Sequence, residues 1–136
     1  MKIVGFGLRK IFGERKEVKA AELNLTQNIE IKEISKEKVN VSTEEVINIK
    51  FAFTVNYSGD LGKIEFEGSV IILPDKDEAK DLSKSVKEQI LADKFKAPIF
   101  NFIMTKCNVK ALMLEDDINL PFHISMPRLP PPPKKD

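Results

Sequence analysis

The chain has 136 residues, with 22 lysine and arginine residues against 21 aspartate and glutamate residues, for a formal net charge of +1. This length is enough for one domain with a core that needs no disulfide. A charge so close to zero gives no electrostatic reason to expect a nucleic acid or an anionic membrane as partner. Cys107 is the single cysteine, and no apolar run is long enough to cross a bilayer. With no signal-peptide pattern at the start, the sequence predicts a cytoplasmic protein that does not insert into membranes.

Two stretches in the first third of the chain alternate apolar and polar residues, a pattern typical of strands with one buried face. The first covers residues 3–12, where glycines leave one face nearly bare and favour close strand packing or a bulge. The second covers residues 23–34, and Ile34 falls out of phase, which indicates a bulge or bend nearby. Val39 and Val41 are expected to extend this pairing.

A hairpin follows and is the clearest feature of the sequence. Residues 47–57 alternate strictly, residues 58–62 supply two glycines for a loop, and residues 64–72 alternate again. With the two earlier strands this predicts a four-stranded antiparallel meander. The phenylalanines at 51 and 53 are interpreted as core residues rather than as an RNA-stacking surface.

The period then changes to that of helices. Pro74 ends the last strand, and Asp75 with Glu78 resembles a capping box. The first helix is then expected to carry one apolar stripe, formed by Ala79, Leu82, Val86 and Ile90. Pro98 is expected in the first turn of a second helix, which ends at residues 115–117. Apolar residues lie on nearly every side of that helix, so the sheet or another subunit must cover it.

The chain ends in an extended apolar segment, residues 120–129, followed by a proline run and a charged end. We therefore expect an α+β protein with a single domain over residues 1–129, two helices on one face of the sheet, and a disordered Pro/Lys-rich tail over residues 130–136.

No catalytic or metal-binding motif is present. His123 is the only histidine, and neither it nor Cys107 has neighbours at the spacing of a zinc site. A nucleophilic Cys107–His123 pair is conceivable, but a cysteine on an apolar helix stripe usually acts as a small hydrophobic residue. The sequence predicts no cofactor, no metal and no enzymatic activity.

In its order of elements the chain resembles the SecB-type protein-export chaperones over residues 3 to about 129. The segment Phe66–Ile71 is similar to the family's fourth-strand pattern, Ala97–Phe102 to its proline-led helical segment, and Leu120–Phe122 to its apolar loop. The resemblance implies a homo-oligomer built as a dimer of dimers, and binding of unfolded polypeptides in apolar grooves without ATP. Such proteins act in protein export or as dedicated antitoxin chaperones. The near-neutral charge and the missing terminal helix depart from the acidic export members, which dock on the SecA motor.

The leading hypothesis is therefore a SecB-like holdase that binds unfolded or preprotein polypeptides. We expect apolar contacts with clients from six residues: Phe6, Leu8, Phe12, Phe122, Ile124 and Met126. We expect an oligomer interface at three more: Phe100, Ile103 and Cys107. The alternative is a homo-oligomeric scaffold that uses its apolar surface in its own assembly and binds no client.

Overall fold

The computed structural model describes residues 1–18, 22–38, 44–125, 127, 129, 130 and 132. Four strands, a short 3-10 helix and two α-helices follow one another: β1 (Lys2–Arg15), β2 (Leu25–Lys38), β3 (Glu45–Tyr57), η1 (Ser58–Asp60), β4 (Gly62–Leu73), α1 (Ala79–Glu88) and α2 (Asp93–Asp117). The predicted α+β class, four antiparallel strands followed by two helices, is confirmed. Val39, Val41, Met126 and most of the proposed tail lie outside the described residues.

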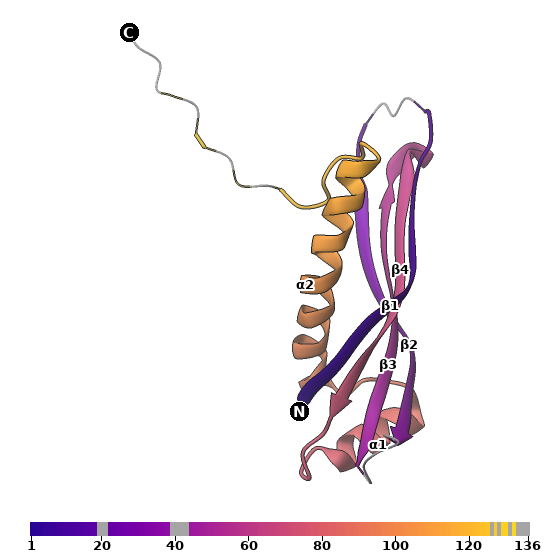
Figure 1. Ribbon diagram of the computed structural model, residues 1–136, viewed down its shortest axis with the longest axis vertical. Coiled ribbons are helices and arrows are strands. Elements are labelled where there is room, and N and C mark those ends of the chain that lie inside the picture. Colours follow the sequence, from indigo (N-terminus) through magenta and orange to yellow (C-terminus); the bar gives the residue numbers. More distant parts are fainter. Residues whose placement is uncertain (19–21, 39–43, 126, 128, 131, 133–136) are drawn as a thin grey trace.

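The strand order differs from the predicted meander. It is β1-β4-β3-β2, and every neighbouring pair is antiparallel. β1 and β2 lie at opposite edges of the sheet, so β1 pairs with β4 and not with β2 (Figure 1). The two strands with the most continuous apolar pattern, β3 and β4, thereby take the central positions, whereas the glycine-rich β1 and the charged β2 form the edges.

One face of the sheet forms the core. The odd residues of β3 and the even residues of β4 lie on this face, because Phe53 pairs with Phe66 and Ile49 with Val70 in the β3–β4 register. The rings of Phe53 and Phe66 stack with centroids 5.6 Å apart, and all four side chains are completely buried. The alternation read from the sequence therefore assigned the buried face correctly.

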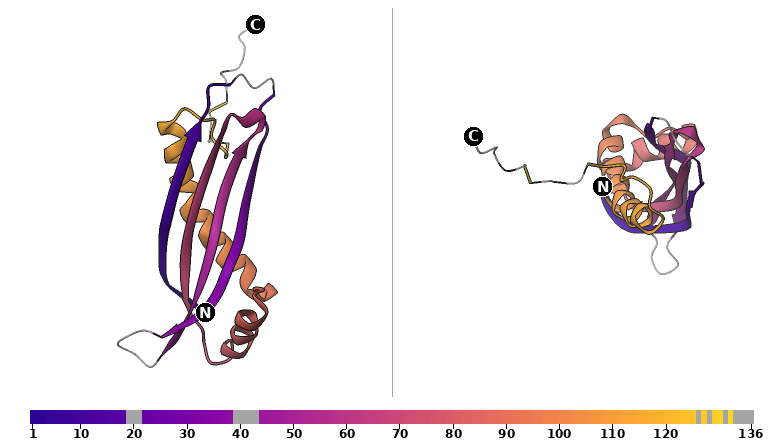
Figure 2. Two further views of the ribbon diagram at one scale, coloured as in Figure 1. Left: turned by 90° about the vertical axis from the view of Figure 1, so that its right-hand side faces the viewer. Right: turned by 90° about the horizontal axis from the view of Figure 1, so that it is seen from above.

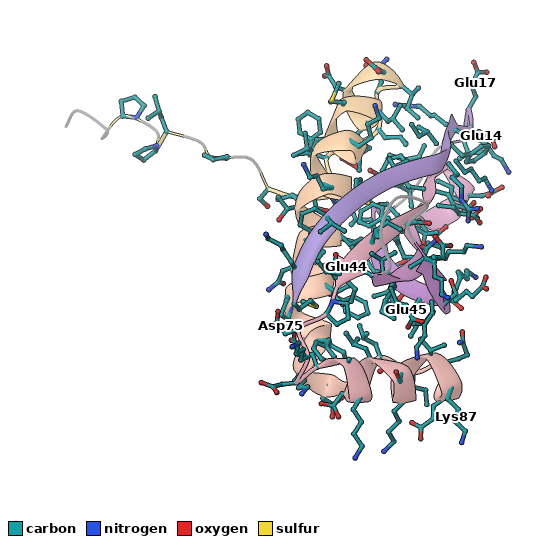
Figure 3. All side chains as sticks on the ribbon, turned by 60° about the horizontal axis from the view of Figure 1, so that its bottom comes forward. Glu14, Glu17, Glu44, Glu45, Asp75 and Lys87 are labelled. Atoms are coloured by element: carbon teal, nitrogen blue, oxygen red, sulfur yellow. The ribbon has the colours of Figure 1, made fainter. Side chains whose placement is uncertain are left out.

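Both helices cover this face. In Figure 2, α2 runs along the sheet and α1 lies across one end of it. Leu82 of α1 is completely buried, whereas Lys87 points away from the sheet (Figure 3). The helix ends at Glu88, so Ile90 lies outside the predicted apolar stripe and is 63% exposed.

The start of α2 corrects the sequence prediction. The helix begins at Asp93, and Pro98 lies inside it rather than in its first turn. The reason is Phe95, which is 2% exposed and lies one turn before Ile99. It is the first residue of the buried line of α2, the series of buried residues that recur every four positions. Burying this ring favours helix from Asp93 onward, although Pro98 has no N–H to donate to the preceding turn.

The predicted irregularity near Ile34 is confirmed as a register shift in β2 between Ile31 and Glu33. The shift returns Ile34 to the core face, where it is 1% exposed. The Gln89 side chain binds the backbone of Ile34 at the outer edge of β2. The Ile34 N–H donates to Gln89 Oε1 at 3.0 Å, and Gln89 Nε2 donates to the Ile34 carbonyl at 2.7 Å. Gln89 thus takes the place of a neighbouring strand at this position.

Candidate functional site

Helix α2 divides the covered face of the sheet into two flanks. Its buried residues recur at four-residue intervals from Phe95 to Glu115 and rest on the sheet. On one side the Phe102 ring lies edge-on to Phe6 of β1, with centroids 5.7 Å apart. On the other side Gln27 of β2 donates from Nε2 to Asn108 Oδ1 at 3.1 Å. A single helix thus leaves apolar sheet surface beside it in both directions.

The β1 flank, defined as Phe6, Leu8, Ile11 and Phe102, is apolar and partly open to solvent. Phe6 stacks on Phe51 with centroids 5.8 Å apart. Phe6, Leu8 and Phe102 are half-buried, and Ile11 is 50% exposed. Because β1 pairs only with β4 among the described strands, its other edge is free for a further strand. Apolar side chains beside a free strand edge are the features that bind an extended polypeptide.

The β2 flank, defined as Leu25, Ile29, Ile31 and Phe100, is also half-buried and packs against the core. The segment after α2, residues 118–124, crosses the end of this helix and comes back toward β2. We call this segment the strap. Its position follows from His123, whose Nε2 lies 2.9 Å from the same Asn108 oxygen that Gln27 contacts.

The strap is held to the end of the sheet by contacts to both its side chains and its backbone. Leu120 is 4% exposed and belongs to the core cluster. The Arg15 guanidinium donates to the Asn119 carbonyl, and the Tyr57 hydroxyl donates to the Pro121 carbonyl at 2.5 Å. Gly62 makes room for this packing, because a Cβ there would lie 2.8 Å from a methyl group of Leu120.

A buried carboxylate is the centre of these contacts. Glu115 is completely buried, and its Oε2 lies 2.9 Å from the Tyr57 hydroxyl, whose single proton is shared between this oxygen and the Pro121 carbonyl. Its Oε1 accepts from the His123 backbone N–H at 3.1 Å, and His123 Nδ1 lies 2.8 Å from both carboxylate oxygens. A buried carboxylate is tolerated when donors surround it in this way. Burial and the Glu115 carboxylate raise the pKa of Tyr57 well above its usual range, so its hydroxyl stays a donor.

This cluster was not predicted from the sequence. The sequence predicted only a helix end at residues 115–117, and the one partner considered for His123 was Cys107. The signal was present in the four-residue spacing of the buried line, which reads as follows: Phe95, Ile99, Ile103, Cys107, Ala111 and Glu115. An acid at the next core position requires buried donors.

The residues predicted to contact clients do not form one groove. Phe6 and Leu8 lie together on the β1 flank. Phe12 lies on the opposite face of the sheet, because it pairs with Glu65 on the polar side of β4. Phe122 and Ile124 belong to the strap, where Phe122 is 44% exposed and Ile124 half-buried. Phe12 is separated from Phe6 and Leu8 because residues 8–10 contain a register shift that changes the alternation along β1.

Two residues of the predicted oligomer interface lie inside the chain. Ile103 and Cys107 are completely buried against the sheet, so in this conformation they offer no surface to a second copy. Phe100 is half-buried on the β2 flank and stays a candidate contact. Burial also raises the pKa of the Cys107 thiol to about 12, which opposes formation of a reactive thiolate at neutral pH.

The other face of the sheet is polar. A shallow cavity of about 420 Å³ at one end contains Phe12 among charged side chains. Glu65 lies 3.4 Å from the Lys10 ammonium and 3.3 Å from that of Lys63. Burial acts to raise the pKa of Glu65, but these two ammonium groups outweigh it and hold the pKa below its usual value.

The fold and the flanks define a class: an α+β protein with an open antiparallel sheet and apolar surface on both sides of one long helix. No family model and no curated protein matches the sequence. Among solved structures, the Mycobacterium tuberculosis Rv1957 SecB-like chaperone, in complex with a ChAD peptide from the Rv1956 HigA1 antitoxin, is similar with a TM-score of 0.49 and 14% identity. The match covers 96% of this chain and 91% of that one. At these values the likeness carries no information on function.

Within the described part of the chain, no helix is both long and apolar enough to cross a membrane. The same residues contain no group of three or more histidine, cysteine, aspartate or glutamate side chains arranged to hold a metal ion.

Proposed function

We propose that this protein is an ATP-independent holdase that binds non-native polypeptides along the flanks of α2. The observation that carries the proposal is the β1 flank, where half-exposed Ile11 and half-buried Phe6 and Phe102 lie beside a free strand edge. An extended client pairs with the β1 backbone and places every second side chain against these apolar residues. Backbone pairing and apolar burial both tolerate many sequences, as a holdase requires.

The clients expected from the sequence resemblance are unfolded preproteins or an antitoxin. A peptide from an antitoxin, a client class that the sequence resemblance implies, is a first probe together with an unfolding model protein. Protein export, cytoplasmic location and assembly as a dimer of dimers belong to the same proposal.

The test is suppression of aggregation of an unfolding model protein without ATP. Ile11 and Phe12 are adjacent residues on opposite faces of the sheet, 50% and 37% exposed, so they form a matched pair. A client can bury the exposed half of the Ile11 side chain, which is worth about 1 kcal/mol. Ile11→Ser removes this contribution and should weaken client binding roughly fivefold. Phe12→Ser should protect as well as the unchanged protein. No protection at several-fold excess, or equal effects of the two substitutions, would refute the proposal.

The scaffold alternative is favoured by one observation. Val109 and Met113 are 59% and 57% exposed and lie one turn apart on the solvent side of α2, where a second copy could cover them. A scaffold that buries its apolar surface in its own oligomer should bind little 1-anilinonaphthalene-8-sulfonate, whereas a holdase should bind the dye in its native oligomer. A large oligomer with no dye fluorescence and no client protection would select the scaffold.

A further inference from the structure

We propose that the strap is a removable cover on the β2 flank, locked by Glu115, and that its release opens a further position for an apolar client segment. This inference rests on the proposed holdase function.

The surface under the strap continues the β2 flank. The His123 ring lies edge-on to Phe53, with centroids 6.2 Å apart, and the Tyr57 hydroxyl binds the strap backbone. In the β2–β3 register Phe53 pairs with Ile29, and Tyr57 pairs with Leu25. The covered residues are therefore direct neighbours of the flank residues. Removing the strap joins them into one apolar surface.

The strap itself shows what kind of occupant this surface accepts. Residues 120–124 contain neither helix nor strand; Pro121 disfavours helix there, and the chain bends at His123 and Ile124. Leu120 is packed in the core cluster, Ile124 is half-buried, and Phe122 is 44% exposed. An apolar polypeptide segment without regular secondary structure is thus already seated there. A client segment of the same chemistry competes for the same position.

The lock is polar and is centred on Glu115 of α2, while Asn108 of the same helix adds one contact, to His123 Nε2. The carboxylate of Glu115 binds both the backbone N–H and the ring of His123, and it also binds the Tyr57 hydroxyl that contacts Pro121. Of the apolar strap side chains between 119 and 124, only Leu120 is fully buried. Loss of the carboxylate should therefore free the part of the strap after Leu120, while Leu120 stays packed on Gly62.

The structural test is hydrogen exchange of two amides in Glu115→Gln. The amide side chain has nearly the same shape, but its NH₂ group meets donors where the carboxylate accepted them. The His123 amide, which donates to Glu115 Oε1, should exchange at least about tenfold faster. The Ile118 amide, which donates to the Leu114 carbonyl at the end of α2, should be unchanged and reports an intact helix.

Two further variants separate the lock from a folding defect. His123→Ala acts from the strap side and leaves α2 untouched, so it should release the strap in the same way. Asp117→Asn makes the same change from carboxylate to amide at an exposed position of α2 and should behave like the unchanged protein. An unchanged His123 amide in Glu115→Gln would overturn the lock.

The functional test measures client protection by the same variants. If the strap competes with the client, the apparent affinity should rise by up to the factor by which the open fraction rises, about tenfold. A freed strap with unchanged or weaker protection would overturn the competition. If neither the unchanged protein nor the released variants protect any client, the holdase function itself fails, and the exchange data still decide whether Glu115 is the lock.

Discussion

Replacing either of two neighbouring glycines in the sheet by alanine should change the free energy of unfolding in opposite directions. Gly7 of β1 pairs with Ser69 of β4, next to the pair formed by Leu8 and Gly68. A Cβ on Gly68 would lie 2.4 Å from the Gly7 carbonyl oxygen and 3.0 Å from a methyl group of Leu8. A Cβ on Gly7 would meet nothing within 4 Å.

The magnitudes follow from these distances. Gly68→Ala pushes β1 away from β4, because the first contact is backbone, and overpacking of this kind costs about 1–3 kcal/mol. The lower entropy of the unfolded alanine chain offsets about 0.4–1 kcal/mol of this cost. Gly7→Ala has the entropic gain without the clash and should raise the free energy of unfolding by about 0.4–1 kcal/mol.

Urea unfolding of the two variants beside the unchanged protein measures both effects. Hydrogen exchange along β1 adds a local readout, since a displaced β1 loses protection in Gly68→Ala only. Because β1 carries the proposed client flank, Gly68→Ala should also weaken client protection. The reasoning is wrong if both substitutions shift stability in the same direction, or if Gly68→Ala is neutral.

Three further outcomes are expected elsewhere in the molecule. Gln89→Glu leaves the Ile34 carbonyl without its side-chain donor and should cost about 1–2 kcal/mol in urea unfolding, with faster exchange around Ile34. The Cys107 thiol should react with a disulfide reagent only after unfolding, because it is buried and its pKa is raised to about 12; rapid reaction of the native protein would contradict this. The pKa of Glu65 is lowered by Lys63, so its contribution to stability is present above the usual carboxylate pKa and is lost as the pH falls through the lowered value. Glu65→Gln should therefore cost less than about 1 kcal/mol at pH 7, and the difference from the unchanged protein should disappear in acid.

Alternation along the chain predicted the four strands and the buried faces of β3 and β4, because each strand of a one-sided sheet carries its own pattern. The order of the strands was not predicted, since alternation says which face is buried and not which strand is the neighbour. Only a comparison of how apolar the strands are indicates which of them lie in the middle of the sheet. The near-continuous burial of β3 indicates a central strand, and the glycines of β1 and the charges of β2 indicate edges.

The two local rules that failed were overridden by packing. Pro98 is a good first-turn residue, yet α2 starts at Asp93 and thereby places Phe95, which is 2% exposed, in the core. Phe12 was counted as apolar client surface by its type alone. The register shift between Leu8 and Lys10 puts it on the polar face, beside Glu65. A one-residue slip reverses every side chain after it, and the sequence of β1 does not mark where the slip occurs.

Glu115 combines both lessons. Its position among the buried residues of α2 follows from counting in steps of four residues from Phe95. A helix that started at Pro98 would still place Ile103 and Cys107 on the same buried side. What the spacing cannot supply is the donors, because Tyr57 comes from β3 and His123 from the strap. A carboxylate at a core position needs such partners from outside its own helix. An acid on an otherwise apolar helix line therefore predicts that a distant segment with donors folds over it, and in this protein that segment is the strap.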